Sequence, residues 1–160
     1  MNLKPLRYFL SVSKTLSFKK ITNYISYCND LNNKKIITNS LPPLINFQAS
    51  AYCNTNCRLC PVGLGISGPP KGFLSYELFR KVIDETSQYL ISINLADWGE
   101  PFLNPDIFNM IKYAENKKVI THASTNLHFF KEEQDLIKLL QSNLSFLIIS
   151  LHGITQETYS

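Results

Sequence analysis

Residues 44–61 read LINFQASAYCNTNCRLCP, and this stretch decides the fold that we expect. Its first half alternates apolar with polar or small residues, a period of two that predicts a β-strand over residues 44–52. Its second half places Cys53, Cys57 and Cys60 in a C-x3-C-x2-C loop directly after that strand. Ligands of α/β sheets bind at the carboxyl ends of the strands, so this loop is the first candidate for a functional site.

Strand-like and helix-like patterns continue to alternate after the loop. This order is typical of βαβ units, which build a parallel sheet covered by helices. We therefore expect an α/β fold with four parallel strands over residues 44–52, 91–98, 119–125 and 146–151. Three helices are expected between them: one after an N-cap at Ser75, one capped by Asn104 with Pro105 at its first position, and one over about residues 131–142.

The first two predicted strands carry polar residues on one face. Asn46, Gln48 and Ser50 alternate with apolar residues in the first strand, and Ser92 and Asn94 do so in the second. A parallel sheet covered by helices on both faces is normally apolar throughout. The polar face therefore predicts a cavity, and with it a barrel-like curve of the sheet around a polar lumen.

Residues 1–42 are interpreted as a helical N-terminal lead-in, and residues 43–160 as the part that contains the sheet. Five residues of the lead-in recur at helical spacing and predict one apolar stripe: Ile21, Tyr24, Ile25, Cys28 and Leu31. Free cysteine behaves as a small buried hydrophobe, so we interpret Cys28 as a packing residue; a role as a fourth metal ligand is the less favoured alternative. The Pro42-Pro43 pair marks a linker.

Composition and charge exclude several classes of protein. Of the 160 residues 44% are hydrophobic and 18% charged, which is typical of a folded globular chain. The first 40 residues hold seven Lys or Arg against one acid, but no arginine-rich or aromatic pattern accompanies them, so we expect no nucleic-acid partner. No apolar run approaches the ~20 residues of a membrane-spanning helix, so we expect no transmembrane segment and a cytoplasmic location.

Three cysteines within eight residues favour metal binding over disulfides in a reducing compartment. Thiolates suit iron-sulfur clusters, and three of them leave one iron of a cluster without a protein ligand. The alternative is a zinc site, which normally needs four ligands. No second half-site is evident, and we interpret His122 and His128 as core or surface residues. The pattern therefore favours an iron-sulfur cluster, with zinc left open.

Four segments resemble the radical S-adenosylmethionine (radical SAM) superfamily, whose members carry CxxxCxxC after the first strand of a partial (β/α)6 barrel. WGEP at residues 98–101 resembles the family's G-E-P segment, and STN at residues 124–126 resembles its S/T-N-G stretch. SLHG at residues 150–153, with Thr155, Glu157 and Tyr159, resembles its S-L-D-G-x-T-x-E-x-Y run. The pattern is closest to the radical SAM proteins that carry a SPASM-type C-terminal domain.

The resemblance implies a four-iron four-sulfur cluster held by Cys53, Cys57 and Cys60, with S-adenosylmethionine chelating the open iron. The reduced cluster would cleave S-adenosylmethionine to methionine and a 5′-deoxyadenosyl radical, which abstracts hydrogen from a substrate. No catalytic side chain is assigned. The residues implied as contacts of S-adenosylmethionine are Gly99, Glu100 and Pro101 as the methionine clamp, Ser124, Asn126 and Ser150 as further contacts, and Leu59 near the adenine.

The resemblance covers about residues 45–159, so we expect an incomplete radical SAM-type (β/α) barrel, with four parallel strands and helices outside. Leu127 and His152 depart from the family pattern, because Gly and Asp are usual there. The implied partners are a low-potential electron donor of flavodoxin or ferredoxin type and a substrate that is a peptide or a small molecule. Two alternatives stay open: a truncated, non-catalytic remnant that binds a cluster, and a zinc-stabilised interaction module that uses the basic lead-in.

Overall fold

The structure, a computed structural model, describes residues 13, 15–66, 70–151, 153 and 155. Its helices are α2 (Phe18–Asn32), α3 (Tyr76–Thr86), α4 (Ile107–Asn116), α5 (Glu133–Gln141) and the short 3-10 helix η1 (Pro101–Leu103). Its strands are β1 (Leu44–Asn46), β2 (Ser92–Asn94), β3 (Ile120–Thr125) and β4 (Phe146–Ile149). No helix in this part of the chain is both long and apolar enough to cross a membrane.

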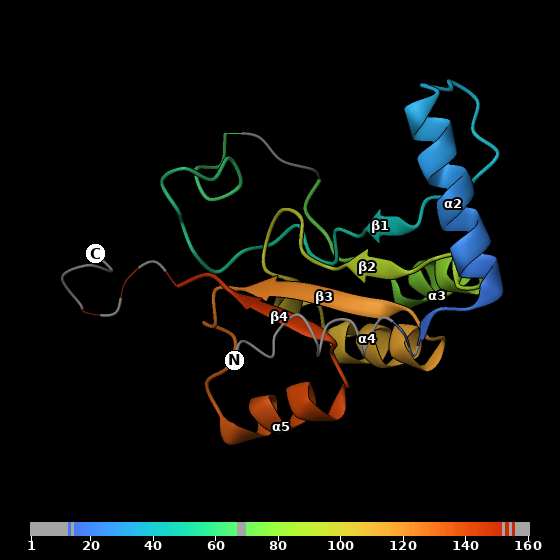
Figure 1. The fold of residues 1–160 in the computed structure, drawn as a ribbon. Coiled ribbons are helices and arrows are strands. Elements are labelled where there is room, and N and C mark those ends of the chain that lie inside the picture. Colours follow the sequence, from blue (N-terminus) through green and yellow to red (C-terminus); the bar gives the residue numbers. More distant parts are fainter. Residues whose placement is uncertain (1–12, 14, 67–69, 152, 154, 156–160) are drawn as a thin grey trace.

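The four strands form one parallel sheet in the order β1-β2-β3-β4. Figure 1 shows α3, α4 and α5 along one face of the sheet and α2 standing at the end where the strands begin. The core lies between the sheet and these helices, and its fully buried side chains include Phe79, Ile83, Ile93, Leu95 and Met110. The predicted α/β fold, with four parallel strands and helices outside, is confirmed.

The face of the sheet opposite these helices is more polar and less buried. The strand register aligns Asn46 with Asn94, Asn94 with His122, and His122 with Phe146, so these four residues form one row across the sheet. None of the four is fully buried. The ring of His122 stacks on that of Phe146 with centroids 4.8 Å apart, and burial lowers the pKa of His122, against the smaller raising effect of Glu115. Of the polar residues predicted to share one face, Asn46 and Asn94 therefore do share it, whereas Gln48 and Ser50 lie beyond the end of β1 and Ser50 is buried.

The first two strands are shorter than predicted. β1 ends at Asn46 and β2 at Asn94. The alternating sequence pattern had predicted strands that continue to residues 52 and 98. After β1 the chain leaves β2 and pairs antiparallel with a later segment, through the bridge between Ser50 and Phe73. At the end of β2 the Asn94 side chain bonds to the backbone of Ala96, which competes with the sheet ladder.

Asn104 does not cap α4, contrary to the prediction. The helix begins at Ile107 with Asp106 at its N-cap position, and the side-chain amide of Asn104 also bonds to two distant segments. Its Nδ2 donates to the carbonyl of Ala49 at 2.8 Å and to that of Leu74 at 3.0 Å, while its Oδ1 accepts from the Asp106 N–H. The predicted N-cap at Ser75 is confirmed, because its hydroxyl accepts from the Leu78 N–H.

The apolar stripe predicted on α2 is largely exposed among the described residues, and the packing role that we assigned to Cys28 is met only in part. Ile25 is 62% exposed and Cys28 is only partly buried. The buried residues of α2 are instead Lys20 and Asp30. The Lys20 ammonium donates to the carbonyl of Lys118 at 2.5 Å, and Asp30 accepts from Lys35 and from the backbone and hydroxyl of Ser40. Polar contacts therefore hold this helix in place.

Lys20 makes the stability of the protein depend on pH. Burial lowers the pKa of Lys20 from 10.5 to about 8, with a smaller contribution from the charge of Lys118. Between these two values the unfolded chain keeps a proton on Lys20 that the folded chain has lost, so the free energy of unfolding rises with pH. Denaturant titrations should show wild type gaining about 2 kcal/mol relative to Lys20→Met between pH 7.5 and pH 10.

The matched control for this prediction is Lys19→Met, which removes an exposed ammonium one position away. It gives the effect of removing an exposed ammonium, with which the Lys20→Met difference is compared. A constant difference for Lys20→Met would show that the buried ammonium does not carry this effect.

Candidate functional site

The cysteine loop lies beyond the carboxyl ends of the strands, and hydrogen bonds join the two segments between which it runs. The Ala51 N–H donates to the carbonyl of Gly72 at 2.9 Å, and the Leu74 N–H donates to that of Ala49 at 3.1 Å. The Asn104 amide bonds to two carbonyls of the same pair of segments. These bonds hold the two ends of the loop, near residues 51 and 72, together at the edge of the sheet where the sequence predicted a ligand.

Two of the three thiols gather at one hydroxyl group. The Oγ1 of Thr55 lies 3.2 Å from Cys53 Sγ and 3.6 Å from Cys57 Sγ. The Cys60 N–H donates to the Cys57 carbonyl at 3.1 Å, and this bond closes a turn between the second and third cysteines. Cys53 and Cys60 are partly buried and Cys57 is exposed, so none of the three cysteines is fully buried.

A close backbone contact shapes the loop at Gly63. A Cβ atom at this position would lie 2.7 Å from the Cys57 nitrogen and 2.9 Å from its carbonyl oxygen. These distances are shorter than a side chain permits, so the return path of the chain beneath Cys57 requires glycine.

Gly99 brings the end of β2 against the start of the cysteine loop. Its φ of +94° lies in the region that favours glycine, and a Cβ atom there would meet the carbonyl oxygens of Ser50 at 2.4 Å and Tyr52 at 2.7 Å. The next residue completes the contact, because the Glu100 N–H donates to the Tyr52 carbonyl at 2.8 Å. The predicted clamp segment and the cysteine loop are thus joined backbone to backbone.

The carboxylate of Glu100 is buried and engaged by the end of β3. Its Oε1 accepts from the Thr125 hydroxyl at 2.8 Å, and its Oε2 accepts from the Asn126 N–H at 2.9 Å. The Phe102 N–H donates to the same carboxylate at 3.4 Å. Pro101 is buried as the first residue of η1. Glu100 therefore connects the ends of two neighbouring strands.

Asn126 extends this connection to the cysteine loop. Its Nδ2 lies 2.8 Å from Asn54 Oδ1, 3.3 Å from Thr55 Oγ1 and 3.8 Å from Cys53 Sγ. Its Oδ1 accepts from the His128 N–H at 2.9 Å. A continuous set of hydrogen bonds therefore runs from Glu100 through the Asn126 backbone and side chain to the first cysteine.

In the part of the chain that the structure describes, the remaining residues implied as contacts of S-adenosylmethionine do not join the hydrogen bonds between Glu100, Asn126 and the cysteine loop. Ser124 and Ser150 face each other across β3 and the end of β4, with their hydroxyl oxygens 3.4 Å apart. Leu59 is 99% exposed, so in this structure it packs against nothing. Leu127 has a φ of +66°, which explains why glycine is usual at this position and costs a leucine about 1–2 kcal/mol. His152, Glu157 and Tyr159 lie outside the described residues.

The chemistry of the loop fits an iron-sulfur cluster. Its donor set is three cysteine sulfurs, which is the ligand type of such clusters. Among residues 13, 15–66, 70–151, 153 and 155, no three His, Cys, Asp or Glu side chains lie close enough together to hold a metal ion. The fit therefore rests on the donor set and on the two sulfurs that meet at Thr55.

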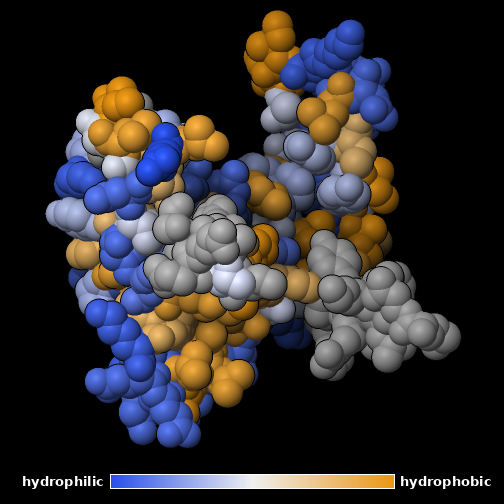
Figure 2. Space-filling model, turned by 90° about the vertical axis from the view of Figure 1, so that its left-hand side faces the viewer, coloured by the Kyte–Doolittle hydropathy of each residue, from blue (hydrophilic) through white to orange (hydrophobic). Residues whose placement is uncertain are grey.

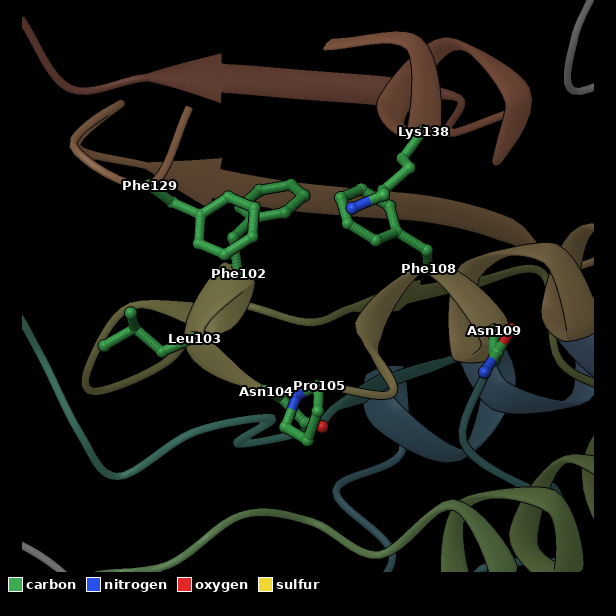
Figure 3. A pocket seen from close by; sticks show the side chains of 8 residues that line it. All are labelled: Phe102, Leu103, Asn104, Pro105, Phe108, Asn109, Phe129 and Lys138. Carbon is green, nitrogen blue, oxygen red and sulfur yellow. The ribbon is translucent and has the colours of Figure 1, made fainter. Parts of the chain in front are cut away.

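Figure 2 views the side toward which the strands point, and it shows a hollow between two raised parts of the surface. A separate pocket of about 510 Å³ lies among η1, α4, α5 and the segment after β3 (Figure 3). Aromatic rings of Phe102, Phe108 and Phe129 line it, and Lys138 stands at its border. No residue of the cysteine loop lines this pocket, so it is distinct from the candidate site.

Several residues of the site were missed by sequence reasoning. Thr55 and Gly63 were not singled out, and Asn104 was assigned to a helix cap. For Gly63 the signal was a glycine three residues after the last cysteine, which suggests a tight return of the chain. Thr55 carried no such signal, because its role depends on where Asn126 lies in space.

Two curated proteins are similar to this chain in sequence. The AdoMet-dependent heme synthase of Methanosarcina barkeri (strain Fusaro / DSM 804) is 29% identical over 124 residues, which are 78% of this chain and 35% of that protein. The S-adenosylmethionine-dependent nucleotide dehydratase of Flammeovirga pacifica is 27% identical over 129 residues, 79% of this chain and 44% of that protein. The chain thus spans less than half the length of these relatives. No family profile matches it.

Two solved structures share the fold. BtrN in complex with AdoMet and 2-DOIA superposes with a TM-score of 0.61 at 20% identity, over 72% of this chain and 48% of that one. Streptococcus suis SuiB bound to S-adenosylmethionine also gives 0.61, at 18% identity, over 85% of this chain and 30% of that one. The comparisons confirm the resemblance to the radical SAM superfamily that the four motifs indicate. The four-stranded α/β fold matches part of the barrel of these neighbours.

Proposed function

We propose that the chain binds a four-iron four-sulfur cluster through Cys53, Cys57 and Cys60 and uses it to cleave S-adenosylmethionine. The observation that carries this proposal is the hydrogen-bonded connection of the three-cysteine loop to the ends of β2 and β3. The end of β2 bears the segment that resembles the methionine clamp, and the end of β3 bears the segment that resembles the ribose contact. The names of both curated relatives support dependence on S-adenosylmethionine.

The geometry distinguishes the roles of the clamp residues. The carboxylate of Glu100 already accepts from three protein donors, so we assign it to positioning the end of β3. Contact with the amino group of S-adenosylmethionine is assigned to the backbone of Gly99 and its neighbours. Ser124 and Ser150, paired on the open face, are proposed to meet the ribose and carboxylate groups with Asn126.

Cys53, Cys57 and Cys60 would hold the cluster, which when reduced would supply the electron for cleavage of S-adenosylmethionine and so the chemistry for abstracting hydrogen from a substrate. The residues of this chain hold and orient the two cofactors. We propose a low-potential flavodoxin- or ferredoxin-type donor for the electron, and a peptide or small molecule as the substrate.

The test is formation of 5′-deoxyadenosine by the anaerobically reconstituted chain, with dithionite as the electron source and S-adenosylmethionine as the other reactant. We expect 5′-deoxyadenosine and methionine in equal amounts, and neither without dithionite. A chain that carries a full cluster yet forms no nucleoside would contradict the proposed reaction and support the non-catalytic remnant. One zinc per chain in place of iron would support the zinc-stabilised module.

A further inference from the structure

Thr55 is the one residue between the first two cysteines that contacts both of their sulfurs in the described part of the chain. Its hydroxyl oxygen lies 3.2 Å from Cys53 Sγ and 3.6 Å from Cys57 Sγ. With the cysteines protonated, the Cys57 thiol donates to this oxygen. A cysteine that ligates iron has lost its proton and can only accept a hydrogen bond. Any hydrogen bond between Thr55 and a ligand sulfur must then have the hydroxyl as its donor.

Asn126 orients the hydroxyl for that role. Its Nδ2 lies 3.3 Å from Thr55 Oγ1 and can only donate to it, so it occupies a lone pair of the oxygen and leaves the hydroxyl proton for another acceptor. Asn126 is itself fixed, because the carboxylate of Glu100 accepts from its N–H and Asn54 Oδ1 accepts from its Nδ2. The nearest sulfur is Cys53 Sγ at 3.2 Å.

We propose that the Thr55 hydroxyl donates a hydrogen bond to Cys53 Sγ when this sulfur is a cluster ligand, and that this bond raises the reduction potential of the cluster. This inference rests on the proposed function, because it presupposes the cluster. A hydrogen bond to a ligand sulfur withdraws electron density from it, and it stabilises the reduced cluster more than the oxidised one because the reduced cluster is more negative. Thr55 is thus a positioning and tuning residue and does not itself touch substrate.

The experiment compares wild type with Thr55→Val, which keeps the shape of the side chain and removes the hydroxyl. Each protein is reconstituted without oxygen, its iron and sulfide are counted, and its reduction potential is measured in a redox titration followed by electron paramagnetic resonance. S-adenosylmethionine is left out, so that the proposed cofactor contact of Asn126 plays no part. Thr55→Ser restores the hydroxyl and is the rescue variant, and Thr55→Ala is a second hydroxyl-free variant without bulk.

At the midpoint potential of wild type, we expect the ratio of reduced to oxidised cluster in Thr55→Val to fall about tenfold, which is ~59 mV for a one-electron couple. Thr55→Ala should shift in the same direction, and Thr55→Ser should stay within about twofold of wild type. Full cluster loading in Thr55→Val or Thr55→Ala with an unchanged potential would overturn the inference and leave the proposed function intact.

Two further outcomes separate this inference from the proposed function. If neither hydroxyl-free variant loads a cluster while Thr55→Ser loads fully, the hydroxyl serves cluster assembly and the tuning role is overturned. If wild type itself takes up no iron and sulfide, the proposed function fails, and the inference fails with it.

Discussion

Cys57→Ala is expected to abolish cluster binding and to leave the fold intact. The residue is exposed in a loop, so its thiol contributes little to the core, but its loss leaves two of the three proposed ligands. Iron content after anaerobic reconstitution should fall at least about tenfold. The free energy of unfolding of the metal-free protein should stay within about 0.5 kcal/mol of wild type, as for most exposed substitutions.

Cys28→Ala is the matched control, since Cys28 is a cysteine of α2 outside the loop. It should keep the full complement of iron and sulfide. Stability is compared without metal because a cluster bound only by the folded state would itself raise the free energy of unfolding. Full loading of Cys57→Ala would refute the ligand assignment, and loss of iron in Cys28→Ala would identify Cys28 as the fourth ligand.

Gly99→Ala is expected to destabilise the protein by about 3 kcal/mol or more. Two costs add at this position. The φ of +94° is strained for any residue with a Cβ atom, and the Cβ atom would lie 2.4 Å and 2.7 Å from two carbonyl oxygens at the base of the cysteine loop. To relieve these close contacts the segment after β2 must move away from Tyr52. This movement also lengthens the hydrogen bond from the Glu100 N–H to the Tyr52 carbonyl. Denaturant unfolding of the metal-free protein measures the loss.

Gly72→Ala provides the comparison for this variant. A Cβ atom at Gly72 would meet nothing within 4 Å, and the carbonyl that bonds Ala51 is retained. Its expected change is below about 1 kcal/mol. Equal stability of Gly99→Ala and Gly72→Ala would mean that the contact between the β2 end and the loop is not tight.

The edge of the sheet that carries the site could be predicted from the sequence, because parallel strands bring their carboxyl ends together. Cys53 and Asn126 are far apart in the sequence, yet both directly follow predicted strands, and the structure brings Asn126 Nδ2 to 3.8 Å from Cys53 Sγ. The alternation over residues 44–52 agrees with the burial of Phe47, Ala49 and Ala51, although Ser50 is buried as well. It did not predict where the strand ends, because the segment before Cys53 pairs with Phe73, a partner that no local pattern identifies.

Side-chain partners were harder to predict than side-chain burial. The Asn104-Pro105 pair has the local signature of a helix start, but the Asn104 amide bonds the carbonyl of Ala49 in a distant segment. The resemblance of residues 98–101 to the family's G-E-P segment implied a ligand contact for Glu100, but its carboxylate accepts from the Thr125 hydroxyl and the Asn126 N–H. In α2 the apolar stripe is largely exposed, whereas Lys20 and Asp30 are buried, and the Lys20 ammonium donates to the Lys118 carbonyl beyond α4.

The central claim is that three cysteines at the carboxyl edge of the sheet hold an iron-sulfur cluster. The most direct measurement is the iron and acid-labile sulfide content of the wild-type chain after reconstitution and purification without oxygen. We expect a brown protein with about four iron and four sulfide per chain, whose colour is lost in air. A colourless chain that takes up no iron from an excess of iron and sulfide would contradict the account.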